Sequence, residues 1–212
     1  MRASALISAQ FHLLRVFMPG ARFSSLSLRP PLAAVALLLA AMLIATQVAW
    51  GRDGYLAAGA LLALGLCWGS VIDIDRMMLP DAITLGLAGV GLAVSLAGGS
   101  HAFVSSAIGC AVGLLVSLGL AEGYRRLRGR DGLGGGDIKL LAAAGAWLGW
   151  EGLPAAVLIA TSAAIVFILG GAALRRRRPD AAGQIAFGPF IAVGIWVVWL
   201  GGASVLGVLA FR

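Results

Sequence analysis

The 212-residue sequence is too apolar for a water-soluble protein, since 60% of its residues are hydrophobic, 12% are charged and the mean hydropathy is +0.98. A soluble domain needs a polar surface that this composition cannot supply. The formal net charge of +7 does not indicate nucleic-acid binding, because the basic residues lie in short loops between apolar runs and form no basic face with interleaved aromatic residues.

Apolar runs in chain order predict an all-α, polytopic membrane helix bundle with about seven transmembrane helices. Runs of about 18 or more apolar residues are long enough to cross a bilayer. The predicted spans are 32–50, 55–73, 81–98, 102–122, 138–150, 155–174 and 186–209, of which the fifth is short. We therefore expect residues 31–212 to form one membrane-embedded domain.

Residues 1–30 precede the first span and are rich in arginine. They do not resemble a cleavable signal peptide, because the apolar run that follows is as long as a membrane span and has no obvious small-residue cleavage site. Ile7, Phe11, Leu14 and Met18 fall on one helical stripe, which favours a helix lying on the inner leaflet. A disordered extension or a misassigned start codon is the alternative.

The arginines gather in alternate loops, and this pattern predicts the orientation in the membrane. They lie before the first span and after the second, fourth and sixth spans, the later ones being Arg76, Arg125, Arg126, Arg128, Arg130 and Arg175 to Arg178. The positive-inside rule places all these loops in the cytoplasm. With seven spans, the N-terminus is then cytoplasmic and the C-terminus lies outside.

The sequence contains little that could bind a metal. Cys67 and Cys110 each stand alone in an apolar run, so they form neither a CxxC pair nor a zinc motif. His12 and His101 are the only histidines, which leaves almost no ligands for a tetrahedral site. We expect no metal and no cofactor, and we interpret both cysteines as small packing residues.

Asp73 stands where helix structure alone does not favour an acid. It ends the second predicted span, where free carbonyl groups and the helix dipole disfavour a carboxylate. Arg76, three residues later, could offset this cost as an ion pair. Because carboxylates at membrane depth are costly and usually functional, we predict a functional role for Asp73.

Asp137 follows a glycine-rich stretch, residues 132–136, and precedes the fifth span. Capping of that helix explains Asp137 as well as a functional role does, and capping also explains Asp81, which begins the third span after Pro80. The glycines permit backbone conformations closed to other residues and let another chain approach closely. The stretch is not a phosphate loop, because no strand precedes it and the GxxxxGK[ST] pattern is absent.

Asp73 and Asp137 both lie at predicted cytoplasmic ends of spans, and therefore at the same depth. Two carboxylates that meet across a bundle do not both ionise easily and can share a proton. One then acts as general base on a water and the other as general acid toward a carbonyl oxygen, which hydrolyses a peptide bond without a metal. The helix dipoles suggest that Asp137 carries the charge and Asp73 the proton.

Three stretches resemble the motifs of the GxGD-type aspartyl proteases, and among them the bacterial type IV prepilin peptidases. Residues 73–81, DIDRMMLPD, are similar to the segment D-x-x-x-x-x-[IL]-P-[DN] of that family. Residues 134–140, GGGDIKL, are similar to G-x-G-D-x-K-[LF]. Residues 187–190, FGPF, are similar to P-F-G-P-[FY], with Ala186 where the family usually has proline.

The resemblance implies an aspartic endopeptidase with Asp73 and Asp137 as its catalytic pair. The residues that it implies around the pair, as shaping the site or contacting substrate, are Gly134, Gly136, Lys139, Arg76, Pro80, Asp81, Gly188 and Pro189. The implied partners are the lipid bilayer and type IV prepilins or type II secretion pseudopilins. Their short basic leader is cut after a glycine at the cytoplasmic face of the bacterial inner membrane, just before a hydrophobic helix.

Larger members of that family carry a cytoplasmic segment with paired CxxC cysteines and also N-methylate the new pilin terminus. This sequence lacks such pairs, which favours a protein that acts only as a peptidase. Two other functions compete with this interpretation. A proton- or ion-coupled transporter would need acids near the middle of the membrane in broken helices, and a non-catalytic assembly factor would use its glycines only for helix packing.

Overall fold

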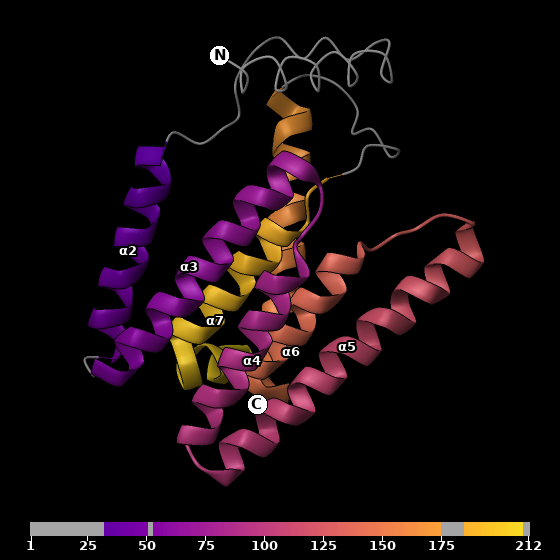
Figure 1. The fold of residues 1–212 in the computed structure, drawn as a ribbon. Helices are drawn as coiled ribbons and strands as arrows, with labels where there is room; N and C mark the ends of the chain where they lie inside the picture. The colour runs from indigo at the N-terminus through magenta and orange to yellow at the C-terminus, as the bar shows by residue number, and fades with distance from the viewer. Residues whose placement is uncertain (1–31, 51–52, 175–184, 210–212) are drawn as a thin grey trace, which may run out of the picture. The chain divides into compact units, whose positions relative to one another are not determined.

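The computed structural model describes residues 32–50, 53–174 and 185–209, and almost all of them are helical. The helices in these ranges are α2 (Leu32–Trp50), α3 (Asp53–Arg76), α4 (Asp81–Ala97), α5 (Ser100–Arg128), α6 (Gly135–Leu174) and α7 (Gly188–Leu209) (Figure 1). No strand occurs in this part of the chain, which confirms the prediction of an all-α fold. The predicted interfacial segment 1–30 and the arginine run 175–178 lie outside the described residues.

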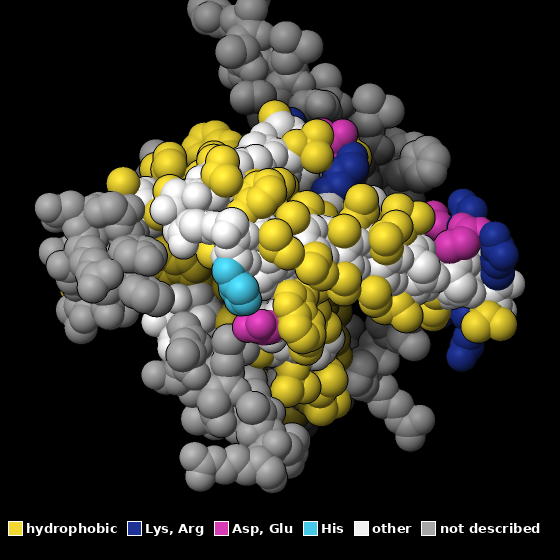
Figure 2. Space-filling view, turned by 90° about the horizontal axis from the view of Figure 1, so that it is seen from below, with side chains coloured by type: hydrophobic (Ala, Val, Ile, Leu, Met, Phe, Trp, Pro, Cys, Tyr) yellow, Lys and Arg dark blue, Asp and Glu magenta, His cyan; other side chains and the backbone are white. Residues whose placement is uncertain are grey.

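The described helices have the length and surface of a membrane protein. Three segments are long and apolar enough to cross a bilayer, namely Leu56–Arg76, Ser100–Arg128 and Gly135–Gly171. Large apolar side chains such as Leu115 and Val166 are more than half exposed. Figure 2 shows hydrophobic side chains over much of one face, with basic side chains toward its edges. The chain is therefore a multi-pass helical membrane protein.

α6 contains the fifth and sixth predicted spans as one element. The helix is broken at Gly149, whose φ of 69° lies in the left-handed region that favours glycine. The chain turns back at this point, so that the second half of α6 runs beside the first (Figure 1). The Phe167 ring then lies 5.5 Å from the Phe190 ring, near the start of α7. A count of seven spans stays a prediction, because the boundary between two of them falls inside α6.

α5 and the first half of α6 pack with their backbones in contact. A Cβ atom added to Gly145 would collide with the backbone of Gly109, and one added to Gly113 would collide with the carbonyl group of Leu141. Small residues allow this close approach. The resulting van der Waals packing stabilises helix contacts in lipid, where no hydrophobic driving force acts between helices. The contact fixes the start of α6, where Asp137 lies, against α5.

The apolar core lies between α3, α4, α6 and α7. Its most buried large side chains include Leu62 of α3 and Ile191 and Ile195 of α7. The Trp147 indole N–H of α6 donates a 2.8 Å hydrogen bond to the Leu87 carbonyl oxygen of α4. A buried indole N–H usually needs a hydrogen-bond partner. The Trp147 ring therefore fills space in the core, and its hydrogen bond also joins α6 to α4. The core thus holds together the helix ends that carry the candidate site.

Candidate active site

Asp73 lies in the last turn of α3 and is 5% exposed. Its Oδ2 atom accepts a 3.0 Å hydrogen bond from the backbone N–H of Gly188, the first residue of α7. The free N–H groups and the positive end of a helix favour a carboxylate at that position. The N-terminus of α7 therefore compensates for the unfavourable C-terminus of α3, and this contact was not predicted from the sequence.

Asp137 lies in the first turn of α6 and is half-buried. The Gly134 backbone N–H donates a hydrogen bond to its carboxylate, and the like charges of Asp73 and Asp137 interact electrostatically. The end of α3 and the start of α6 therefore bring the two carboxylates near enough for their charges to interact. Each carboxylate lies at the N-terminus of a helix, so the helix dipoles no longer distinguish which one carries the charge and which the proton.

Leu79 joins the three stretches that the sequence singled out. Its buried side chain lies against Gly136 and Gly188, where added Cβ atoms would stand 2.7 Å from Leu79 Cβ and 2.8 Å from Leu79 Cδ1 respectively. The connection between α3 and α4 therefore packs against the first turns of both α6 and α7. Leu79 was not among the predicted site residues, although it occupies the [IL] position of the motif in residues 73–81.

The glycines before Asp137 serve close packing rather than an unusual backbone. Within the described residues, the positive-φ glycines are Gly99, Gly129 and Gly149, so neither Gly134 nor Gly136 uses a left-handed conformation. The expectation of special backbone angles in this stretch was wrong. The expectation of close approach is confirmed at Gly136, whose missing side chain leaves room for Leu79.

Asp81 does not cap α4. It is the first residue of the helix, Pro80 is the N-cap, and no side-chain capping hydrogen bond is formed. The Asp81 Oδ1 atom instead accepts a hydrogen bond within an ion pair from Lys139 of α6. The capping interpretation was therefore wrong, and the ion pair provides a second link between the α3–α4 connection and the start of α6.

The remaining predicted residues lie at the periphery of this cluster. Arg76 ends α3 with an exposed side chain and makes no ion pair with Asp73, so the predicted charge compensation is absent. Pro189 is half-buried in the first turn of α7. Between these regions, Met77 has a φ of 53°, a left-handed conformation that ends α3 and costs a non-glycine residue roughly 1 kcal/mol. This strained position was not predicted from the sequence.

Comparisons with known proteins match the part of the chain that contains both aspartates. The model of the type IV leader peptidase family matches residues 60–169. The prepilin leader peptidase/N-methyltransferase of Aeromonas salmonicida (strain A449) is 40% identical over 151 residues, which cover 69% of this chain and 51% of that protein. The protein of the same name from Stutzerimonas stutzeri is 35% identical over 184 residues, covering 86% and 62% respectively.

A third protein of that name, from Pseudomonas aeruginosa, is 36% identical over 169 residues, which cover 79% of this chain and 58% of that protein. The chain spans about half the length of the first curated relatives that it matches, which is 51% for the Aeromonas salmonicida protein. No solved structure matches the chain.

Proposed function

Because the chain belongs to the type IV leader peptidase family, we propose that it is an aspartic endopeptidase that removes the leader of type IV prepilins or type II secretion pseudopilins. The observation that carries this proposal is the convergence of three separate stretches of sequence on one pair of carboxylates. Asp73 and Asp137 interact electrostatically, and the Gly188 N–H holds one of them. The proposed cut lies after a glycine, just before the hydrophobic helix of the precursor.

In the proposed mechanism the two carboxylates share one proton. The ionised carboxylate takes a proton from a water molecule, whose oxygen attacks the carbonyl carbon of the scissile peptide bond. The protonated carboxyl group donates its proton to the carbonyl oxygen as the tetrahedral intermediate forms. The carboxyl group that took the water proton then gives it to the leaving nitrogen, and the other carboxylate takes a proton back from a hydroxyl of the intermediate. The carbon–nitrogen bond breaks, and the pair again holds one proton.

The shaping residues act by fixing the separation of the two carboxylates. Gly188 and Gly136 let Leu79 lie between the starts of α6 and α7. Pro80 ends the connection before α4, and the Asp81–Lys139 ion pair holds that connection to α6. Gly134 positions Asp137 through its backbone. Small shifts in such supports are costly, since a misplacement of about 1 Å can lower a rate by roughly 10²-fold.

We propose that the site faces the cytoplasm of a bacterium and that the protein lies in the inner membrane. The last turn of α5 carries Arg125, Arg126 and Arg128, and a short connection leads from it to the start of α6 and Asp137. The positive-inside rule places this end of the helices in the cytoplasm. The transporter alternative receives no support, because Asp73 and Asp137 stand at helix ends rather than at the middle of the membrane.

The experiment that tests the function is co-expression of the chain with a candidate prepilin in a host that lacks its own leader peptidase. We expect the precursor to lose its leader, which mass spectrometry of the purified pilin detects as a new N-terminus directly after the leader glycine. A panel of type IV prepilins and type II pseudopilins then identifies the substrate class. Failure to cut any member, with the chain inserted at a normal level, would contradict the proposal.

The Lys139–Asp81 ion pair yields a prediction by charge exchange. Lys139→Asp or Asp81→Lys alone places like charges together and is expected to slow leader removal several-fold, since a partly exposed pair contributes up to about 1 kcal/mol. The double exchange restores the opposite charges and should recover most of the rate. Arg126→Glu is the control, because its partner Glu122 lies on the same helix, so that this ion pair links no separate elements. A double variant no better than the singles would contradict a positioning role.

A further inference from the structure

An apolar groove lies between α3 and α4, next to the candidate active site. It has a volume of about 360 Å³. On α3 its wall consists of Leu61, Leu64, Gly65 and Trp68, which follow the i, i+3, i+4, i+7 spacing of one helix face. Leu61, Leu64 and Trp68 are each more than half exposed.

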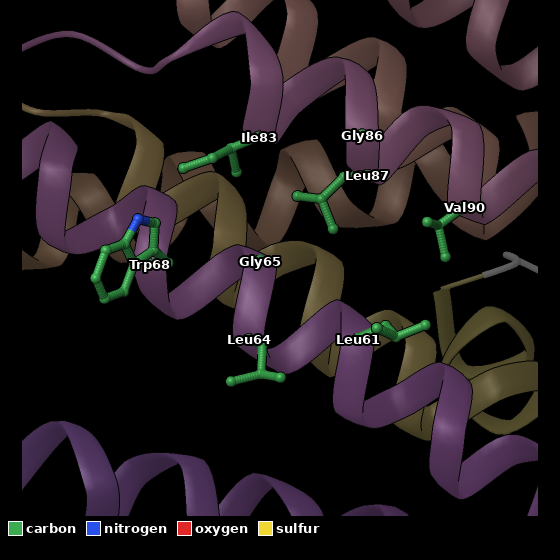
Figure 3. Close-up of a pocket in the computed structure, with 8 residues that line it drawn as sticks. All are labelled: Leu61, Leu64, Gly65, Trp68, Ile83, Gly86, Leu87 and Val90. Carbon is green, nitrogen blue, oxygen red and sulfur yellow. The ribbon is translucent and has the colours of Figure 1, made fainter.

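The wall on α4 repeats the same spacing with Ile83, Gly86, Leu87 and Val90. Figure 3 shows Trp68 and Ile83 at one end of the groove and Leu61 and Val90 at the other. α4 packs chiefly against α6 and only narrowly against α3, so the groove stays open. Two parallel stripes with helical spacing are what a third apolar helix needs for ridges-into-grooves packing.

Two glycines make the groove deep enough for a neighbouring helix. Gly65 lies directly against Leu87, so that an added Cβ atom would stand 2.5 Å from Leu87 Cδ2, and this contact closes the floor. Gly86 has no heavy atom within 4 Å of its Cβ position, so its face of α4 is open. Small residues at such positions are typical of helix contacts in membranes, because they let the partner backbone approach closely.

The groove is continuous with the site. Its upper end at Ile83 adjoins Gly69, where an added Cβ atom would stand 3.6 Å from Ile83 Cγ2 and 3.9 Å from Leu79 Cδ2. Leu79 in turn contacts Gly188, which binds Asp73. At a rise of about 1.5 Å per residue, the groove covers the stretch of α3 from roughly 7 to 18 Å below Asp73.

We propose that this groove binds the apolar helix of the precursor on the carboxyl side of the cut. The inference rests on the proposed peptidase function and names the subsite for the part of the substrate that remains in the membrane. A peptide bond held at Asp73, just before an apolar helix, requires that helix to descend into the bilayer from the level of Asp73. The groove begins at that level and presents apolar side chains at helical spacing along the path.

The charge at the upper end of the groove fits the same substrate. Asp75 is two helical turns beyond Trp68 on the same stripe of α3, is exposed, and makes no ion pair with any described residue. A basic leader on the cytoplasmic side would meet this carboxylate, while the apolar helix occupies the groove below. A lipid acyl chain would match the apolar walls but neither the helical spacing nor the acidic end.

Gly86→Leu and Gly89→Leu form a matched pair of variants for the test. Both positions lie on α4 and have no heavy atom within 4 Å of an added Cβ, but only Gly86 lines the groove. Leucine also has the higher helix propensity, so neither change is expected to prevent folding. Gly86→Leu should lower kcat/KM for a full-length precursor by roughly tenfold or more, the effect of blocking an apolar subsite. Gly89→Leu should leave it unchanged.

Two substrates separate the groove from the chemistry. A short leader peptide that ends a few residues after the cut should be processed equally by wild type and Gly86→Leu, because it does not reach the groove. Equal effects of the two leucine variants on the full-length precursor would overturn the proposal. If wild type cuts neither substrate, the proposed peptidase function is wrong. A binding measurement that needs no cleavage then tests whether the groove holds the apolar helix of the precursor.

That measurement uses a photo-crosslinking amino acid at Trp68 in the full chain carrying Asp73→Asn, reconstituted in lipid with the uncut precursor. Crosslinks to the apolar helix of the precursor, reduced by Gly86→Leu and not by Gly89→Leu, support the proposal. Crosslinks that reach lipid alone would show that the groove is part of the lipid-facing surface, and would overturn it.

Discussion

Asp73→Asn and Asp137→Asn are each expected to lower the rate of leader removal by about 10⁴-fold or more, because a paired-carboxylate mechanism loses its shared proton when either partner becomes an amide. Asparagine keeps the size of the side chain, and at position 73 its carbonyl oxygen can still accept the hydrogen bond from Gly188. The measurement is mass spectrometry of the precursor after co-expression, with the inserted enzyme quantified by immunoblot. The double variant should be no slower than either single variant, since the two groups act as one unit.

Asp131→Asn is the matched control, because Asp131 is an exposed acid in the connection just before the glycines that precede Asp137. Its change should leave leader removal unaffected. A rate within about tenfold of wild type in either aspartate variant would exclude a paired-carboxylate mechanism, because that chemistry requires both groups.

Gly188→Ala is expected to reduce the rate by roughly 10²-fold, through displacement of the Asp73 carboxylate. The added Cβ atom would lie 2.7 Å from Asp73 Oδ2 and 2.8 Å from Leu79 Cδ1, so both groups must move. Because Gly188 contacts Asp73 and does not line the groove between α3 and α4, we expect the loss in kcat rather than in KM. Single-turnover cleavage in detergent, with thermal unfolding of the same preparations, separates a displaced carboxylate from a misfolded protein.

Gly170→Ala provides the comparison for this glycine. An added Cβ atom there would meet no heavy atom within 4 Å, and alanine is the better helix former. Leader removal by Gly170→Ala should equal that of wild type. Gly188→Ala with an undiminished kcat would show that the contact between α7 and Asp73 does not position a reacting group.

The membrane class and the position of the two aspartates at helix ends could be predicted from the sequence, because hydropathy is a local signal. The break at Gly149 lies inside the fifth predicted span, 138–150, one residue before its predicted end, close to where the apolar pattern weakens at Trp150 and Glu151. The predicted ends of the helices were less accurate than the predicted positions of the spans. α3 continues past its predicted end to Arg76, because the bundle supports polar turns that a hydropathy pattern excludes.

The partners of the site residues could not be predicted, because they depend on contacts between distant segments. The sequence assigned Asp81 to a helix cap, which is a local role, whereas its partner Lys139 is 58 residues away. The contacts of Leu79 with the two glycine-containing turns likewise arise only when α6 and α7 pack against α3. An apolar side chain in an apolar sequence gives no signal that it lies beside a reacting group, and the groove between α3 and α4 was missed for the same reason.

The hydrogen bond between Asp73 and Gly188 also sets an order of events during biosynthesis, since its two ends are 115 residues apart. At a synthesis rate of roughly 5–20 residues per second, about 6 to 23 seconds separate the emergence of the acid from that of its donor. During this interval Asp73 has no helix N-terminus to compensate its charge, so the end of α3 must stay near water or keep its acid neutral. A chain stalled before residue 188 should therefore leave this helix end loosely seated, where surveillance proteases of the membrane can reach it.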